Sequence, residues 1–379
     1  MSEPHRPAQV DVDALLDDPG TRVIVCCGSG GVGKTTTAAA LAVRAAERGR
    51  KTAVLTIDPA RRLAQALGLR ELGNQPKQVV VEGFEPAGDL NAMMLDMRRT
   101  FDDMVLAHAG RERAEQILNN PFYQTISTSF SGTQEYMAME KLGQLSASGQ
   151  WDLIVVDTPP SRSALDFLDA PQRLSTVLDG RLIKMLSSPA RAGGKGLRKI
   201  VGAGFGIFAK AVSTIIGGQL LADAARFVQA FDSTFGGFRE RAEHTYQLLR
   251  SPGTAFLVVA APEPDALREA TYFVERLAGE RMPLAGLVAN RTHPVFTGLA
   301  GARATAVAEE IEATGEAPMA AAALRVHADR VAVAEREKRL LARFTRAHPE
   351  VAMVGVPALP TDVHDLAGLQ EIGRRLAGE

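Results

Sequence analysis

Cysteine is nearly absent from this chain of 379 residues, which contains only the neighbouring pair Cys26 and Cys27. Adjacent cysteines cannot build an ordinary disulfide framework, and the chain has no CxxC pair of the kind that binds zinc. An excess of positive charge is also lacking, because 43 lysines and arginines face 44 aspartates and glutamates. These absences argue against a disulfide-stabilised secreted domain and give no reason to expect nucleic acid as a partner. We therefore expect a cytoplasmic protein.

The first 20 residues lack a long apolar run. Their sequence, MSEPHRPAQVDVDALLDDPG, is polar and acidic, which excludes a signal peptide. We expect residues 1–20 to form a mobile leader that includes one short helix. The chain as a whole is 46% hydrophobic and 23% charged, which is typical of a soluble globular protein with a large core or two domains.

The stretch VIVCCGSGGVGKTTTAAALAVRAAERG, residues 23–49, places a glycine loop between a β-rich run and an alanine-rich helical run. Residues 28–35 match the phosphate-binding pattern GxxxxGK[ST]. Glycines let backbone N–H groups wrap phosphates closely, and a helix N-terminus favours negative charge. We expect Lys34 to reach the β- and γ-phosphates and the Thr35 hydroxyl to bind Mg²⁺. The predicted nucleotide-binding residues of this loop are Gly28, Ser29, Gly30, Gly31, Val32, Gly33, Lys34, Thr35 and Thr36.

Short apolar runs recur after the glycine loop, with helix-like stretches between them. This alternation predicts an α/β fold with a doubly wound, mostly parallel sheet. In such a sheet the ligand binds at the carboxyl ends of the strands. The runs lie at 52–58, 153–160, 255–264, 284–291 and 351–360.

Two aspartates end predicted strands, where they would face the phosphates. Asp157 follows the run Leu153–Val156 and is the expected acidic partner of the Mg²⁺ shell, with a cap of the next turn as the alternative. Asp58 ends the run LTID, where it would join the metal shell or orient the attacking water. Because Pro59 follows at a predicted helix start, spacing alone leaves capping open for Asp58 as well.

The motifs DPARRLAQALG, DTPPSRSALDFL, APEPDALREATYFVERL, VANR and PALPTDVHDLAGL follow the glycine loop in this order. Together they resemble the ArsA-type ATPases, a family that includes the arsenical-pump ATPase and the guided-entry targeting ATPase for tail-anchored proteins. The resemblance spans most of the chain. It implies a P-loop NTPase with an inserted α-helical subdomain. It also implies a dimer that Mg²⁺–ATP closes and hydrolysis opens, and that binds or targets a hydrophobic client.

The resemblance also implies roles for individual residues. Asp58 would position the attacking water in switch I, and Asp157 would begin switch II. Asn290 would contact adenine, and Glu263 would lie near the nucleotide. The loop with Pro357 and Pro360 would close over the base. Since VANRTH lacks the Asn-Lys-x-Asp pattern that reads guanine, ATP is the expected nucleotide.

The sequence departs from the family pattern at Ser29, where the family usually has a lysine that crosses the dimer interface. A serine is short and uncharged, so it cannot stabilise charge on the facing nucleotide. Either Arg61, Arg62 or Arg162 supplies that charge, or a related subunit with the lysine does. The partner is therefore a second copy or a related chain. Without CxxC or scattered cysteines, neither a zinc-clamped dimer nor an arsenite site is expected.

The predicted domain division separates a nucleotide-binding part (21–99, 146–164 and 251–379) from a helical part (100–145 and 165–250). The insert begins with a basic, glycine-rich stretch, read as a solvated loop or as a contact for anionic lipid at the inner membrane. An apolar stripe follows over 207–231. Its glycines and Lys210 argue against a membrane span, which leaves subdomain packing or a groove for a client helix.

Two other features bear on partners. Four methionines within 90–106 are read as core or as an adaptable partner surface. The C-terminal residues 366–376 are read as a helix docked on the sheet rather than on a membrane. Two other functions stay open: a partitioning ATPase that acts on membrane or DNA, and a nucleotide-binding, non-catalytic subunit of a heteromeric complex.

Overall fold

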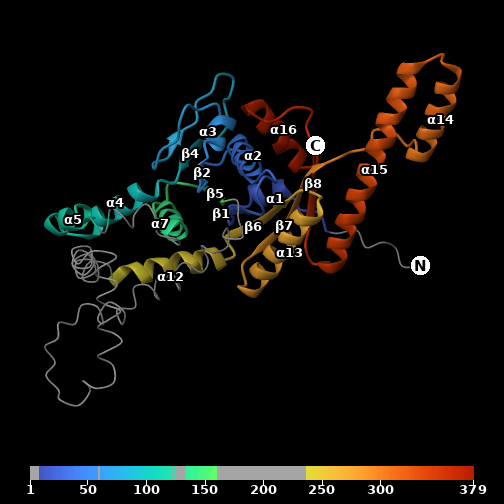
Figure 1. Cartoon of the computed structure of the whole chain (residues 1–379). Coiled ribbons are helices and arrows are strands. Elements are labelled where there is room, and N and C mark those ends of the chain that lie inside the picture. Colours follow the sequence, from blue (N-terminus) through green and yellow to red (C-terminus); the bar gives the residue numbers. More distant parts are fainter. Residues whose placement is uncertain (1–7, 59, 122, 124–132, 160–235) are drawn as a thin grey trace, which may run out of the picture. The chain divides into compact units, whose positions relative to one another are not determined.

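The computed structural model describes residues 8–58, 60–121, 123, 133–159 and 236–379 (Figure 1). The chain divides into a sheet unit (Met1–Met94, Ser148–Leu165 and Leu248–Glu379) and a helical unit (Leu95–Ala147 and Asp166–Gln247). Arg162, the basic stretch of the insert and its apolar stripe lie outside the described residues. The predicted domain boundaries and the client groove therefore stay predictions.

The sheet unit is built on eight described strands in the order β3-β4-β2-β5-β1-β6-β7-β8. Neighbouring strands run parallel, except for the short antiparallel pair of β3 with β4. The predicted mostly parallel α/β sheet is thereby confirmed. The strands are β1 Val23–Cys27, β2 Thr52–Thr56, β3 Lys77–Gln78, β4 Leu90–Met94, β5 Leu153–Asp157, β6 Thr254–Ala260, β7 Leu284–Thr292 and β8 Met353–Pro357.

The central strands are mostly apolar because both of their faces are covered. Every residue of β1, β2, β5 and β6 is buried. A strand that packs against helices on both sides has no solvent-facing positions, so its sequence shows no alternation. The runs VIVCC and LIVVD follow from this burial, and they bring the polar residues that end them to one edge of the sheet.

β4 is a strand that the sequence analysis does not expect. Its sequence, LNAMM, belongs to the methionine-rich stretch, and methionine is not a typical strand residue. Pairing with β2 and burial decide its conformation. Met93 and the later Met104 are fully buried, so these two methionines fill cores.

The helices on the two faces follow from the direction of the connections. α2 (Lys34–Glu47) links β1 to β2 on one side of β1, whereas α13 (Pro264–Gly279) links β6 to β7 in the opposite direction. Right-handed crossovers that run in opposite directions place their helices on opposite faces of the sheet (Figure 1). β1 therefore lies where the winding reverses, which is where ligands bind in such sheets.

Other helices of the sheet unit extend or close this core. α16 (Leu366–Leu376) packs on α2 and β8, with Leu369, Ile372 and Leu376 buried. α14 (Gly301–Thr314) and α15 (Pro318–Ala347) pack against each other, and α15 also contacts α13. The remaining helices of this unit are α1 Val12–Asp17 and α3 Arg62–Ala66.

The helical unit contains α4 (Met97–His108), α5 (Arg111–Leu118), α7 (Thr133–Ala147) and most of α12 (Gly236–Arg250). α4 packs on α5 and α7, and Asp96 caps its first turn. An ion pair joins α12 to α7, because Arg241 Nε lies 3.2 Å from Glu140 Oε2, whose side chain is 3% exposed. None of the described helices combines the length and the apolar character that crossing a bilayer requires.

The N-terminal segment is attached to α2 through ion pairs. The expected short helix is α1, and its Val12 and Leu16 are fully buried. Arg44 of α2, whose side chain is 8% exposed, lies 2.6 Å from Asp13 and 2.7 Å from the side chain of Glu379. One guanidinium therefore connects α1, α2 and the end of the chain. The hydrogen bond from Arg44 lowers the pKa of Asp13, more than burial raises it.

We expect Arg44→Ala to lower the free energy of unfolding by about 2 kcal/mol at pH 7, because it removes the shortest ion pair of the partly buried carboxylate of Asp13, whose other partner, Arg48, lies 3.2 Å away. The matched change Arg48→Ala, in a side chain 32% exposed, should cost less than about 1 kcal/mol. Because the folded pKa of Asp13 is lowered, the stability from this pair is present above its unfolded pKa, about 4, and is lost as the pH falls through the folded value. Urea denaturation at pH 7 and pH 3.5 measures this; equal losses at both pH values would contradict it.

Candidate nucleotide-binding site

The loop between β1 and α2 depends on glycines with positive φ. Gly28, Gly31 and Gly33 have φ values of 148°, 77° and 95°. A Cβ at Gly28 would lie 2.1 Å from the carbonyl oxygen of Val259, so only glycine lets the chain leave β1 this close to β6. Gly33 is also the N-cap of α2. The loop therefore brings the N-terminus of α2 to the carboxyl edge of the sheet, as the pattern predicts.

Lys34 is the first residue of α2 and is only 5% exposed. Its Nζ donates a hydrogen bond of 2.7 Å to the carbonyl oxygen of Ser29, across the loop. Burial lowers the pKa of Lys34, and the nearby carboxylate of Asp157 opposes that change. A buried ammonium held at this loop is suited to a polyanionic ligand, whose charge would replace the lost hydration.

Asp157, at the end of β5, is joined to the first turn of α2. The hydroxyls of Thr35 and Thr56 both donate to its Oδ2 at 2.8 Å. Burial raises the pKa of Asp157 to about 6, and the two hydroxyl hydrogen bonds oppose that rise. The other oxygen, Oδ1, is buried and has no hydrogen-bond partner among the residues that the structure describes. A carboxylate oxygen beside a threonine hydroxyl is the oxygen donor set that Mg²⁺ prefers, so these residues fit the metal.

Asp58 lies just beyond β2 and is 8% exposed. Its Oδ1 accepts a hydrogen bond of 2.9 Å from the backbone N–H of Ala60. This is a local turn rather than a helix cap, because the N-cap of α3 is Arg61. Asp58 also lines the cavity beside the loop, so its turn does not remove it from the site.

The end of β7 contacts the same loop. The Asn290 side chain donates from Nδ2 to the carbonyl oxygen of Val32 at 2.7 Å, and Asn290 is 7% exposed. A Cβ at Gly33 would lie 2.2 Å from that Nδ2. The following residue, Arg291, donates from Nη1 to the carbonyl oxygen of Gly31 at 3.1 Å. Arg291 has no assigned role in the sequence analysis, where only the motif VANR contains it.

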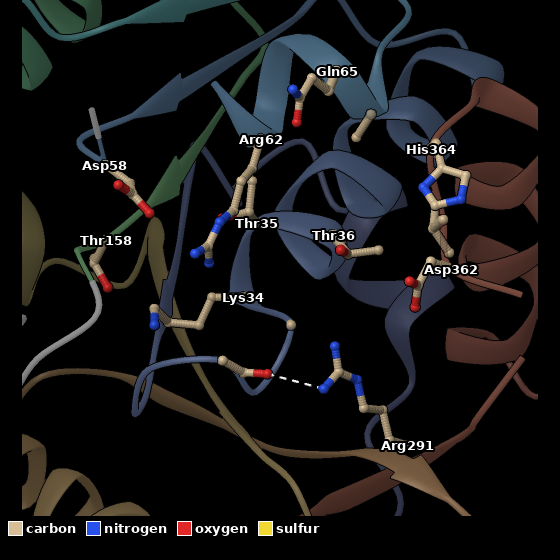
Figure 2. A pocket seen from close by; sticks show the side chains of 14 residues that line it. Lys34, Thr35, Thr36, Asp58, Arg62, Gln65, Thr158, Arg291, Asp362 and His364 are labelled. Carbon is tan, nitrogen blue, oxygen red and sulfur yellow. Dashed lines mark hydrogen bonds between the residues drawn. The ribbon is translucent and has the colours of Figure 1, made fainter. Parts of the chain in front are cut away.

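A cavity of about 640 Å³ lies over the loop and collects most of these groups (Figure 2). Lys34, Arg62 and Arg291 reach it from separate segments, and Asp362 and His364 lie on the side next to α16 (Figure 2). The sequence analysis names Arg62 but misses the polar cavity residues Gln65, Thr158, Arg291, Asp362 and His364. Asp362 and His364 directly follow the predicted adenine loop, which is the signal that might have found them.

Several predicted residues lie apart from this cavity lining. Glu263 is the exposed N-cap of α13, and its side chain makes no capping hydrogen bond. Pro357 ends β8 and Pro360 is exposed beyond it. Arg61 lines a second, smaller cavity of about 230 Å³ next to β2 and Leu72. Their predicted roles at the nucleotide stay predictions.

The two cysteines lie in β1 and are fully buried. Burial raises the pKa of both thiols, to about 12 for Cys27, and the Sγ of Cys27 lies 3.7 Å from the carbonyl oxygen of Leu257. Thiols with such pKa values stay protonated at neutral pH and are poor metal or metalloid ligands. The cysteines therefore act as small apolar residues behind the loop.

We expect Gly33→Ala to weaken ATP binding by roughly a hundredfold, because the new Cβ meets Asn290 and a positive φ is strained for alanine. Gly31→Ala is the matched variant: its φ of 77° is also positive, but no atom lies within 4 Å of the new Cβ. It should weaken binding only about tenfold. Anisotropy of a fluorescent ATP analogue compares the two, and equal losses would show that the contact with Asn290 is unimportant.

Comparisons with known proteins agree with this geometry. The family model for anion-transporting ATPases (ArsA ATPase) matches residues 21–296. The ATPase GET3 of Podospora anserina is 27% identical over 281 residues, 74% of this chain and 76% of that protein. The ATPase GET3 of Malassezia globosa is 31% identical over 164 residues, 43% of this chain and 46% of that protein.

The ATPase GET3 of Ajellomyces dermatitidis is 27% identical over 281 residues, 73% of this chain and 74% of that protein. The range that the family model matches covers most of the chain and includes the glycine loop, Asp58, Asp157 and Asn290. The chain therefore belongs to the anion-transporting ATPase (ArsA) family and is an ATP-hydrolysing P-loop enzyme.

Proposed function

We propose that the loop at residues 28–36 binds Mg²⁺–ATP and that its hydrolysis opens a dimer that ATP has closed. The observation that carries this proposal is the bond between Thr35 and Asp157 beside the buried Lys34. These three side chains come from the helix start and the neighbouring strand end that a P-loop nucleotide site requires.

In this site the residues have separate tasks. Backbone N–H groups of the loop and the N-terminus of α2 bind the phosphates, and Lys34 would leave the Ser29 carbonyl to reach the β- and γ-phosphates. Thr35 and Asp157 would hold the metal, with Asp58 near the same shell. When bound, Mg²⁺ would neutralise charge on the β- and γ-phosphate oxygens. Asn290 and the loop with Pro357 and Pro360 are proposed to contact adenine, and Glu263 to lie close by.

Asp58 is the proposed residue that orients the attacking water. Its carboxylate lines the cavity on the side of β2, where it faces the end of Lys34 (Figure 2). The turn to Ala60 uses only Oδ1, so the second oxygen remains for the water. A carboxylate at this place positions the nucleophile and accepts its proton as the bond to phosphorus forms.

Ser29 favours a partner that differs from this chain. It stands where ArsA-type loops usually carry a lysine that reaches across the dimer, and its hydroxyl is too short and uncharged for that task. We propose a dimer with a related subunit that keeps the lysine, with a homodimer as the alternative. In that assembly this chain either hydrolyses ATP with help from its partner or serves mainly as a nucleotide-binding subunit.

The proposed client is defined by its chemistry, as a hydrophobic segment. We propose that the helical unit changes shape with the nucleotide cycle and holds or releases a hydrophobic segment, as the family resemblance implies. The described part of that unit has buried faces on α4 and α7, and its Arg241–Glu140 pair ties α12 to α7. The chain would act in the cytoplasm or at the inner membrane surface.

We expect Asp58→Asn to lower kcat for ATP hydrolysis by roughly 10²–10⁴-fold, because the amide cannot accept the proton. Nucleotide affinity should stay close to wild type, since asparagine can still accept the bond from Ala60. Asp329→Asn, an exposed carboxylate on α15, is the control with unchanged turnover. Steady-state phosphate release and binding of labelled ADP measure both effects. Wild-type turnover in Asp58→Asn would exclude Asp58 from catalysis.

We expect Ser29→Lys to raise the turnover of the purified chain at least about tenfold, because it restores the crossing charge. Ser29→Met, of similar length but uncharged, is the matched control and should not raise it. Turnover and dimer mass would be measured together at saturating ATP. A wild-type homodimer that already hydrolyses ATP as fast as Ser29→Lys would contradict the requirement for a lysine-bearing partner.

A further inference from the structure

Asn290 and Arg291 are consecutive residues of β7, yet both side chains bond to the glycine loop. Asn290 reaches the carbonyl oxygen of Val32, and Arg291 reaches that of Gly31. In a regular strand successive side chains point to opposite faces of the sheet. One of these two residues must therefore have left the regular strand geometry.

The irregularity lies at Arg291. The pairing of β7 with β8 shifts register between Asn290 and Thr292, and Arg291 has a φ of 61°. An extra residue in one strand of a pair turns its side chain away from the regular alternation, and such bulges occur beside active sites. A positive φ is strained for arginine and persists only where the surrounding structure holds it.

The residues after Arg291 provide that support. Ala358 donates its backbone N–H to the carbonyl oxygen of Thr292 at 2.9 Å. The backbone N–H and the ring of His293 contact the two carboxylate oxygens of Glu337 on α15, at 2.8 and 2.6 Å. Arg330 of α15 donates to the carbonyl oxygen of Pro294 at 3.0 Å. β8 and α15 thus fix the chain on the far side of the strained residue.

The result is a cation at the rim of the nucleotide cavity. Arg291 lines the cavity with Gly31, Gly33 and Lys34, and its guanidinium extends toward the middle of it (Figure 2). A guanidinium has five N–H donors, and the bond to Gly31 uses one of them. Planar guanidinium groups bind phosphate oxygens well through paired N–H donors. A single backbone carbonyl needs only one such donor, so the other donors of Arg291 are available for a phosphate.

We infer that Arg291 is a phosphate-binding residue that contacts the nucleotide held by its own chain. The inference rests on the proposed placement of ATP at the glycine loop. Arg291 would add a second positive charge to the one that Lys34 of the loop motif supplies. Ser29 leaves the loop with Lys34 as its single lysine. Arg291 provides a second cation from the same subunit, placed by a bulge in β7 rather than by the motif.

Displacement of fluorescent ADP from the full chain tests this inference, with ATP, ADP and inorganic tripolyphosphate as competitors. We expect Arg291→Ala to weaken all three by about tenfold, and Arg291→Lys to stay within about threefold of wild type. Arg291→Gln keeps a donor for Gly31 without the charge and should lose affinity as the alanine variant does. Arg281→Ala is the matched control, since Arg281 also has positive φ (56°) but precedes β7 at the opposite edge of the sheet.

Three results would overturn the inference. The first is wild-type affinity in Arg291→Gln and Arg291→Ala. The second is a loss for ATP and ADP without a loss for tripolyphosphate, which would place Arg291 on the base or ribose. The third is an equal loss in Arg281→Ala, which would show that the loss does not come from a side chain that lines the cavity. Lys34→Ala separates failure of this inference from failure of the proposed function. If the Lys34→Ala variant also binds nucleotide as tightly as wild type, the nucleotide is not at this loop, and the proposed function fails as well.

Discussion

The close approach of the glycine loop to the ends of β6 and β7 controls the rest of the site. Gly28 lies so near the Val259 carbonyl that no side chain fits, and Gly33 lies equally near the Asn290 amide. These contacts hold the loop in one conformation, with its N–H groups and the start of α2 directed at the cavity. Lys34, Thr35 and the cavity itself take their positions from this conformation.

Two ionisable side chains beside that loop are buried, and burial of a charge without full pairing costs free energy. Asp157 is fully buried, and one of its oxygens has no partner in the described part of the chain; Lys34 is almost fully buried and donates to the Ser29 carbonyl. Burial raises the pKa of Asp157 and lowers the pKa of Lys34, so it favours the neutral form of each side chain. A bound metal and polyphosphate would supply the missing partners, so ligand binding should stabilise the sheet unit as well as start the reaction.

Ser29 and Arg291 together decide the positive charge around the glycine loop. Ser29 removes a charge that would act across a dimer, and the bulge at Arg291 brings one in from the same subunit. In the proposed function the two charges would serve different purposes, because a cation in the same chain would assist binding, whereas one from the partner would couple hydrolysis to dimer closure. Under the proposed function, this chain would bind nucleotide by itself and rely on its partner for full activity.

The sequence alone determined the fold class and the centre of the site. Buried parallel strands must be apolar throughout, and a loop that wraps phosphate needs glycines at fixed spacing, so both leave patterns that local reading detects. The sequence analysis did not predict β4, because pairing with β2 rather than local propensity makes this segment a strand. Only the tertiary structure decided the cavity wall: Arg291, Asp362 and His364 reach the loop through a strained backbone and through segments more than 250 residues away in sequence. Such contacts depend on how distant elements pack, and no local pattern records that.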